Sequence, residues 1–273
     1  MTEVKGRTAF ITGGANGIGL GMARTFGRAG AKLALADLDE DALARAKSEL
    51  KDAAPVETYR LDVRDRDAYA ATAEAVEHAL GPVSLLFNNA GVATGTPAEK
   101  LTYDLWDWGI GINLYGVING IQTFLPKMVE RGQGGHIVNT ASGAGLVPTN
   151  SGVLYTTAKY GVVGLSESLN LELAAFGIGV TVLCPGPVAT DIVQRSVAAA
   201  PKTGEVLTPE RQRFQEEVLA QTVQYLQQGA SIDEVGEMVL EAVRQNNLYI
   251  HTDPSVGDMI RKRTKDLLDA MPS

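Results

Sequence analysis

The sequence predicts a single α/β domain built on a doubly wound parallel sheet of about seven strands. Short apolar runs alternate with longer amphipathic runs, which is typical of strands joined by crossover helices on both faces of a sheet. The 273 residues are 45% hydrophobic, enough for one large core. A glycine-rich turn at residues 12–19 follows the first apolar run directly and opens a helical run, as expected where a parallel sheet begins.

The individual elements follow from this alternation. Strands are predicted at 7–12, 32–36, 56–61, 83–87, 136–140, 180–184 and 248–251. Helices are predicted at 17–28, 40–51, 66–79, 103–130, 153–176 and 233–245, with Asp39 and Asp65 as caps of the second and third. Residues 192–229 break the pattern, so we expect an insertion that selects the substrate, with a helical run at 209–228. A C-terminal helical tail is expected at 254–271.

Charge and composition exclude several classes of partner and site. Twenty-four basic and 32 acidic side chains give a net charge of −8, which opposes binding to nucleic acid or an anionic membrane. Cys184 is the only cysteine and the three histidines are scattered, so neither an intramolecular disulfide nor a metal site is predicted. No signal peptide is recognisable, and the uncharged stretch 108–126 contains polar residues typical of a buried helix. We therefore expect a cytoplasmic protein.

The glycine-rich turn predicts a phosphate site. Gly13, Gly17 and Gly19 stand where the chain must turn and let a pyrophosphate approach backbone amides at the start of a helix. Asp37 ends the second strand, where a carboxylate can accept hydrogen bonds from the adenosine ribose. This carboxylate would repel a 2′-phosphate, and position 16 is Asn16 rather than a basic residue, so NAD is favoured over NADP.

The spacing of this turn resembles that of the short-chain dehydrogenase/reductase family, which has a Rossmann-type fold. Three residues separate Gly13 from Gly17, one more than in the ordinary G-x-G-x-x-G fingerprint. Further family motifs follow in order along the chain, from residue 6 to about residue 251: Asp62–Val63, Asn88–Asn89–Ala90–Gly91, Asn113, Ser142, Tyr155-x-x-x-Lys159 and Pro185–Gly186–Pro187–Val188–Ala189–Thr190. The resemblance implies an oxidoreductase that interconverts a secondary alcohol and a ketone with NAD.

By this resemblance, residues 62 and 63 border the adenine, residues 89–91 lie along the cofactor, and residues 185–190 hold its nicotinamide side. The predicted cofactor residues, combining this resemblance with the phosphate site, are Gly13, Asn16, Gly17, Ile18, Gly19, Asp37, Leu38, Asp62, Val63, Asn89, Ala90, Gly91, Tyr155, Lys159, Pro185, Gly186, Val188 and Thr190.

Tyr155 and Lys159 lie four residues apart in a predicted helix, so their side chains leave the same face. Oxidation of an alcohol needs a group that takes the hydroxyl proton, and a tyrosine with a pKa of about 10 is a poor base unless a neighbouring cation stabilises its phenolate. We therefore expect Lys159 to tune Tyr155, and Ser142 to hold the substrate oxygen. The resemblance adds Asn113, which interrupts helical bonding and holds a water that links Lys159 to solvent.

The predicted substrate residues are Ser142, Ala144, Tyr155, Gly186, Ile192 and Val193, which form an apolar pocket around the reacting oxygen. Within the family, the runs at 102–142 and 248–254 resemble a bacterial subgroup that includes the lignin-type aryl-ether Cα-dehydrogenases, which oxidise a benzylic secondary alcohol with NAD. The alternatives are a hydroxysteroid, a small diol or sugar alcohol, or reduction of a 3-oxoacyl thioester. A protein that senses NAD without catalysis is the alternative outside enzymes.

Gly109, Gly116 and Gly120 form a small-residue stripe with Asn113 at helical spacing, which favours close contact with another helix. Internal packing alone could account for the stripe. In the resembled family this helix and the one carrying Tyr155 form the main subunit interface, so a homo-oligomer, a tetramer or a dimer, is the expected state.

Overall fold

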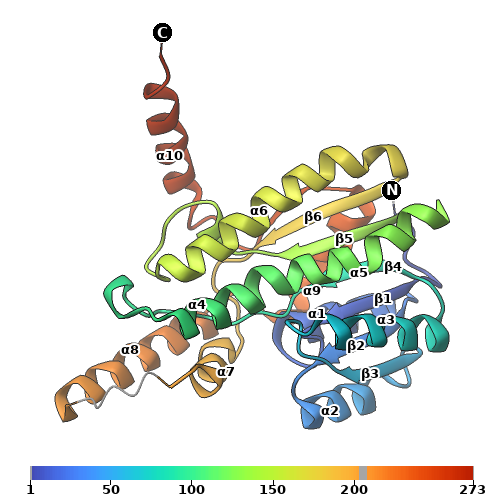
Figure 1. Cartoon of the computed structure of the whole chain (residues 1–273), viewed down its shortest axis with the longest axis horizontal. Coiled ribbons are helices and arrows are strands. Elements are labelled where there is room, and N and C mark those ends of the chain that lie inside the picture. Colours follow the sequence, from blue (N-terminus) through green and yellow to red (C-terminus); the bar gives the residue numbers. More distant parts are fainter. Residues whose placement is uncertain (1, 203–207, 273) are drawn as a thin grey trace.

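Seven parallel strands form one twisted sheet in the computed structural model, which describes residues 2–202 and 208–272 (Figure 1). The strand order is β3-β2-β1-β4-β5-β6-β7, and every neighbouring pair is parallel. Their bounds are β1 Thr8–Thr12, β2 Lys32–Asp37, β3 Val56–Arg60, β4 Val83–Asn88, β5 Gly135–Thr140, β6 Ile178–Cys184 and β7 Tyr249–His251. The order reverses between β1 and β4, which confirms the doubly wound prediction and opens a crevice at the carboxyl ends of the strands.

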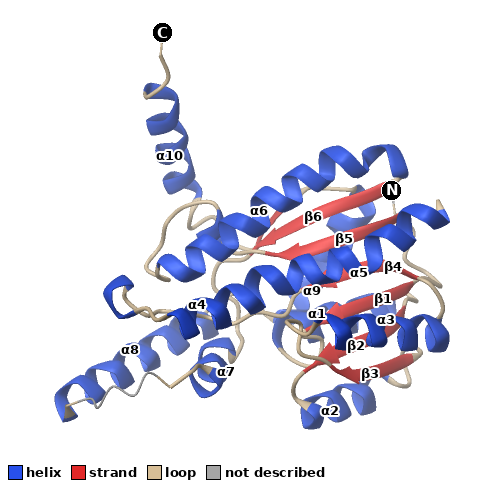
Figure 2. Ribbon diagram, viewed as in Figure 1, coloured by secondary structure: helices blue, strands red, loops and turns tan. Residues whose placement is uncertain are grey.

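Helices cover both faces of this sheet (Figure 2). One face packs against α1 (Gly17–Arg28), α2 (Glu40–Leu50) and α9 (Ile232–Gln245). The other packs against α3 (Arg66–Leu80), α5 (Gly116–Arg131) and α6 (Val153–Leu173). The predicted caps are present, since the Asp39 and Asp65 carboxylates accept hydrogen bonds from Ala42 N and Ala68 N, each at 2.9 Å.

The helix predicted at 103–130 is interrupted. It consists of α4 (Tyr103–Ile110), a π-helical turn at Gly111–Tyr115 and α5. A π turn holds one more residue than an α-helical turn, so the residues after it are rotated about the helix axis. The helix predicted at 153–176 is also shorter, because α6 ends at Leu173 and a 3₁₀ turn follows at Ala174–Phe176.

The small-residue stripe packs inside the chain. A Cβ added at Gly109 would lie 2.2 Å from Leu154 Cδ2 on α6, and one at Gly116 would lie 2.7 Å from Val63 Cγ2. At Gly120 the added atom would lie 2.0 Å from Asn88 Oδ1 at the end of β4. The three glycines therefore bring α4 and α5 against their own sheet and α6, and the interpretation of the stripe as a subunit contact is replaced by internal packing.

Three helices after β6 lie outside the regular alternation of strands and covering helices. They are α7 (Ile192–Ala199), α8 (Pro209–Gln227) and, after β7, α10 (Gly257–Asp269), whereas α9 between them packs on the sheet. No residue of α8 or of α10 is buried, and α10 projects away from the body of the molecule (Figure 1).

Candidate active site

The turn after β1 is shaped for a phosphate group. Gly13 and Gly17 have φ angles of +62° and +50°, which favour glycine. A Cβ at Gly19 would lie 2.1 Å from the Gly13 carbonyl oxygen, so only hydrogen fits there. The first N–H groups of α1 have no intrahelical acceptor, the first turn contains no acidic residue, and the Asn16 side chain forms no cap hydrogen bond. These donors suit the pyrophosphate of a dinucleotide.

The loop after β4 is fastened to this turn. The Thr12 hydroxyl accepts hydrogen bonds from Asn89 N at 2.9 Å and Ala90 N at 3.1 Å, and the Asn89 amide donates to Thr12 O at 3.1 Å. The Thr140 hydroxyl donates to Asn89 Oδ1 at 3.1 Å, which adds the end of β5. The predicted residues 89–91 thus lie beside the glycine turn, where the strand order reverses.

Asp37 lies at the end of β2 and is only 8% exposed. Its Oδ2 accepts from Ala15 N at 3.3 Å and its Oδ1 accepts from Asp39 N at 3.2 Å. These bonds hold the carboxylate beside the glycine turn. A cation that the sequence did not place here, Arg195 of α7, lies with its Nη2 3.6 Å from Asp37 Oδ1.

The residues predicted to border the adenine, Asp62 and Val63, follow β3, and Leu38, another predicted cofactor residue, directly follows β2. Arg64 Nη2 donates to Asp62 Oδ2 at 2.6 Å, and this hydrogen bond lowers the pKa of Asp62. Val63 is buried under Gly116 of α5, whereas Leu38 is exposed. The Asp62 carboxylate therefore already accepts hydrogen bonds from Arg64, while the exposed Leu38 side chain offers apolar surface to a ligand.

Tyr155, Ser142 and Lys159 meet at the carboxyl ends of β5 and β6. Burial raises the pKa of Tyr155, and a side-chain hydrogen bond with Ser142 acts in the opposite direction. Lys159 Nζ lies 5.6 Å from the centroid of the Tyr155 ring and donates to Thr140 O at 2.9 Å. Lys159 is 4% exposed, and burial lowers its pKa to about 8. A phenol, a hydroxyl and an amine are thus gathered at one point, where they can exchange a proton with a bound alcohol.

Asn113 lies in the π turn and is fully buried. Its Oδ1 accepts from Val92 N and its Nδ2 donates to Val92 O, both at 3.0 Å. Gly91 lies between this side chain and the lysine, since a Cβ there would be 3.0 Å from Asn113 Oδ1 and 3.6 Å from Lys159 Nζ. The π turn therefore places Asn113 next to Lys159 and the loop after β4.

The segment at 185–190 closes the opposite side of the crevice. Gly186 N donates to the Thr252 hydroxyl at 3.0 Å, and a Cβ on Gly186 would lie 1.5 Å from Asp253 Oδ2. Val188 is buried, and a methyl group of Thr190 would lie 3.2 Å from a Cβ at Gly17. The segment thus spans from the glycine turn to the end of β7.

The predicted substrate residues lie on two sides of this crevice. Ala144 is buried beside Ser142, and its N–H donates to the Ser142 hydroxyl at 3.1 Å. Ile192 and Val193 begin α7 and are half-buried. Neither side chain forms a hydrogen bond with Tyr155 or Ser142, so their contact with a substrate stays a prediction.

Sequence reasoning missed four residues at this site: Arg195, Ser196, Thr252 and Asp253. Asp253 Oδ2 is buried and has no hydrogen-bond partner among the described residues. Thr252 and Asp253 directly follow β7, and the rule that sites form at the carboxyl ends of parallel strands could have found them. No comparable signal existed for Arg195 and Ser196, because the path of an insertion does not follow from its sequence.

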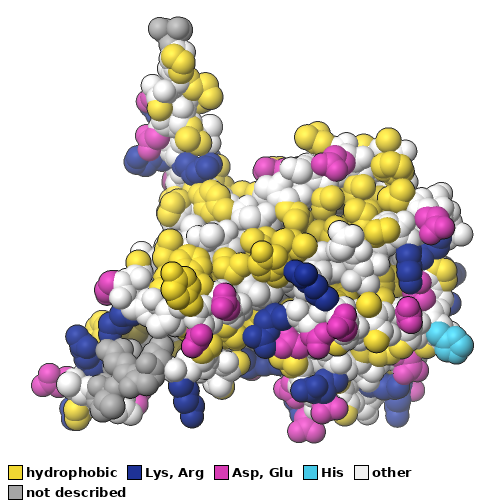
Figure 3. All heavy atoms as spheres, in the orientation of Figure 1, with side chains coloured by type: hydrophobic (Ala, Val, Ile, Leu, Met, Phe, Trp, Pro, Cys, Tyr) yellow, Lys and Arg dark blue, Asp and Glu magenta, His cyan; other side chains and the backbone are white. Residues whose placement is uncertain are grey.

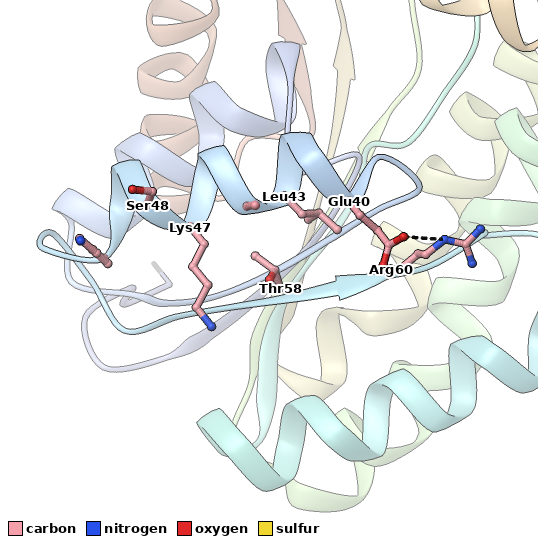
Figure 4. Close-up of a pocket in the computed structure, with 8 residues that line it drawn as sticks. Glu40, Leu43, Lys47, Ser48, Thr58 and Arg60 are labelled. Carbon is pink, nitrogen blue, oxygen red and sulfur yellow. Dashed lines mark ion pairs between the residues drawn. The ribbon is translucent and has the colours of Figure 1, made fainter.

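Elsewhere in the described part of the chain, the candidate sites are weaker. A surface hollow between α2 and β3 is lined by Glu40, Leu43, Lys47, Ser48, Thr58 and Arg60 (Figure 4). Lys51 also lines it, and two of its cations are in ion pairs, since Arg60 Nε lies 3.8 Å from Glu40 Oε2 and Lys47 Nζ lies 2.7 Å from Glu57 Oε2. Residues 2–202 and 208–272 contain no group of three metal-ligating side chains, and no helix among them is long and apolar enough to cross a bilayer.

Comparison with known proteins agrees with this geometry. The family model described as short chain dehydrogenase matches residues 7–201. A C alpha-dehydrogenase of Sphingobium sp. strain SYK-6 is 37% identical over 273 residues, covering 99% of this chain and 88% of that protein.

Two solved structures are similar over almost the whole chain. A short chain dehydrogenase/reductase from Burkholderia phymatum in complex with NAD has a TM-score of 0.90 and 35% identity, covering 100% of this chain and 98% of the other. The apo form of LigO from Sphingobium sp. strain SYK-6 has a TM-score of 0.82 and 37% identity, covering 99% and 91%.

Proposed function

This chain belongs to the short-chain dehydrogenase family, and we propose that it is an NAD-dependent dehydrogenase that oxidises a secondary alcohol to a ketone. The observation that carries the proposal is the convergence of Tyr155, Ser142 and Lys159 beside a turn that accepts a pyrophosphate. A protein that only senses the dinucleotide would not need this set of proton-exchanging groups.

In the proposed mechanism the Ser142 hydroxyl donates a hydrogen bond to the alcohol oxygen, and the Tyr155 phenolate accepts one from the alcohol hydroxyl and then takes its proton. The oxidised nicotinamide supplies the acceptor for the hydride that leaves the alcohol carbon. Lys159, as an ammonium, favours the phenolate and binds the nicotinamide ribose. Asn113 keeps the helix open next to Lys159, so that a water can connect this amine to solvent.

The proposed cofactor preference is NAD over NADP. Asp37 is held by two backbone N–H groups with its carboxylate beside the turn, where it can accept from the ribose hydroxyls. A phosphate on the ribose 2′ position would meet this carboxylate at short range, with unfavourable energy. The solved relative with NAD supports the same choice.

The proposed substrate is a bulky hydrophobic alcohol, with a benzylic alcohol as the best candidate. The C alpha-dehydrogenase supports this choice, because its alignment covers 99% of this chain and so includes residues 192–229, beyond the residues 7–201 that the family model matches. Ala144, Ile192 and Val193 supply apolar surface and no charge. We assign residues 192–229 to substrate selection within the single domain.

The proposed assembly is a homo-oligomer, a tetramer or a dimer, in the cytoplasm. Hydrophobic side chains gather over α5 and α6 on the face seen in Figure 3. Exposed large apolar side chains on these elements and the turns next to them are Leu171 of α6, Phe176 of the 3₁₀ turn after it and Tyr115 of the π turn before α5. Burial of such a patch against a second subunit removes apolar surface from water. A mass of 28.9 kDa by light scattering, that of one chain, would contradict this assembly.

The test is absorbance of reduced nicotinamide with NAD or NADP and a panel of secondary alcohols, including benzylic aryl ethers, steroids and diols. Tyr155→Phe removes the proton acceptor, so we expect kcat to fall by about 10²–10⁴-fold. Tyr103→Phe is the matched control, because Tyr103 is 87% exposed and lies on α4. Full activity in Tyr155→Phe, or turnover with NADP alone, would contradict the respective part of the proposal.

A further inference from the structure

Helix α7 is fastened to both halves of the crevice at the carboxyl ends of the strands. Ser196 is buried, and its hydroxyl accepts a hydrogen bond from Ala93 N at 2.8 Å, in the loop after β4. The neighbouring Arg195 extends the other way, to the turns after β1 and β2. The helix predicted to select the substrate is therefore also attached to the part of the site that holds the dinucleotide.

The Arg195 guanidinium lies at the glycine turn itself. With its amide oxygen oriented toward the guanidinium, the Asn16 side chain accepts from Arg195 Nη1 at 2.7 Å and from Nη2 at 3.2 Å. Asn16 is the N-cap of α1, whose first turn contains the N–H groups that suit a phosphate. The arginine thus stands next to those donors and adds a full positive charge.

The carboxylates near Arg195 leave N–H donors of its guanidinium without a hydrogen bond to them. Its Nη2 lies 3.6 Å from Asp37 Oδ1 and 3.7 Å from Asp39 Oδ2, both longer than a hydrogen bond. A guanidinium has five N–H donors, and a phosphate accepts two of them in a bidentate geometry. Donors therefore remain for an anion at the turn, and the side chain is 43% exposed and accessible to one.

We propose that Arg195 is a cofactor-binding residue, contributed by the substrate helix, which binds the pyrophosphate of the dinucleotide. This inference depends on the proposed dinucleotide binding and extends it to the insertion. Because Ile192 and Val193 belong to the same eight-residue helix, the bond to the dinucleotide fixes the substrate side of the crevice as well.

The experiment measures ADP-ribose binding by calorimetry in the full chain, with Arg195→Gln as the test variant. A charge-assisted hydrogen bond contributes about 1.5–3 kcal/mol, so we expect binding to weaken by about 10-fold or more. Arg213→Gln on α8 makes the same charge change at an exposed position and should bind as the unaltered chain does. Unchanged or stronger binding in Arg195→Gln would overturn the proposal, since the arginine would then be neutral or block the ribose site.

A second ligand separates the pyrophosphate from the ribose 2′ position. The affinity for ADP-ribose that carries a 2′-phosphate should fall in Arg195→Gln by the same factor as the affinity for ADP-ribose itself. A larger fall for the 2′-phosphorylated ligand alone would overturn the pyrophosphate assignment. Ser142→Ala, at a residue assigned to the substrate oxygen and not to the cofactor, should lower turnover but keep full ADP-ribose affinity, so the binding result stands apart from the dehydrogenase activity. Failure of the unaltered chain to bind ADP-ribose would overturn both proposals. In turnover, Arg195→Gln should raise the KM of the alcohol as well as that of NAD.

Discussion

The half of the molecule that holds the dinucleotide site and the two exposed helices α8 and α10 are built in different ways. Around the glycine turn, side chains are packed so closely that Gly13, Gly19 and Gly91 have no room for even one methyl group without a shift of the backbone or a side chain. In α8 and α10, by contrast, no residue is buried, and large apolar side chains such as Phe214 and Leu268 face solvent. The first region presents one fixed shape to a constant ligand, whereas the second keeps apolar surface for other contacts.

The largest expected difference between the two regions is in the unfolding free energy lost when a phenylalanine in each is replaced by alanine. Phe26 of α1 is fully buried, with its ring 4.7 Å from that of Phe87 on β4, so Phe26→Ala should cost about 3–5 kcal/mol of unfolding free energy. Phe214→Ala on α8 should change it by less than about 0.5 kcal/mol, because that side chain is 66% exposed. Chemical denaturation of both variants checks this, and similar losses would show that α8 is part of the core.

The next largest effect is the pH dependence of stability that comes from the buried ammonium of Lys159, near the dinucleotide site. Burial lowers the pKa of Lys159 from 10.5 to about 8, so above that pH the folded state gives up a proton that the unfolded chain still holds. The unfolding free energy should therefore rise with pH from about 8 to about 10, by up to about 3 kcal/mol, and this residue should contribute no pH dependence below that window, where the full cost of burying its charge is present. Subtraction of the curve for Lys159→Met isolates this contribution in urea titrations.

Lys159→Met should also change the kinetics in a direction that stability alone does not explain. Without a neighbouring ammonium the Tyr155 phenolate is less favourable, so the acid limb of kcat/KM against pH should move to higher pH. An acid limb that stays in place would mean that Lys159 does not tune the tyrosine.

A smaller effect tests the fixed shape directly. Gly19→Ala places a Cβ 2.1 Å from Gly13 O, and the turn must shift to admit it, which should weaken ADP-ribose binding by about 10–100-fold. Gly95→Ala is the control, since a Cβ at that exposed position meets no atom within 4 Å. Equal affinities for the two variants would mean that the turn is adaptable rather than fixed.

The same division limits what the sequence could predict. The sheet, its seven strands and the residues gathered at the switch in strand order followed from periodicity and from motifs, because each depends on local chain geometry. The interruption of the long helix at Asn113 was expected from the resemblance, but its form, a π turn at Gly111–Tyr115, was not, since the apolar helical run itself does not mark where one residue is added. The position of Arg195 against Asn16 and Asp37 was not expected either, because it depends on how α7 packs across the crevice.

The number of residues in the π turn determines how the following helix α5 is rotated against the sheet. Each residue of an α-helix advances about 100° around its axis, so loss of one residue from the turn would rotate all of α5 by that angle. Gly120 would then leave Asn88, and a larger side chain would be forced against the end of β4. A one-residue deletion here should therefore disturb the molecule more than most substitutions, although it would restore a regular helix. The number of residues in this turn, as much as their identity, would then be constrained in any functional variant of the chain.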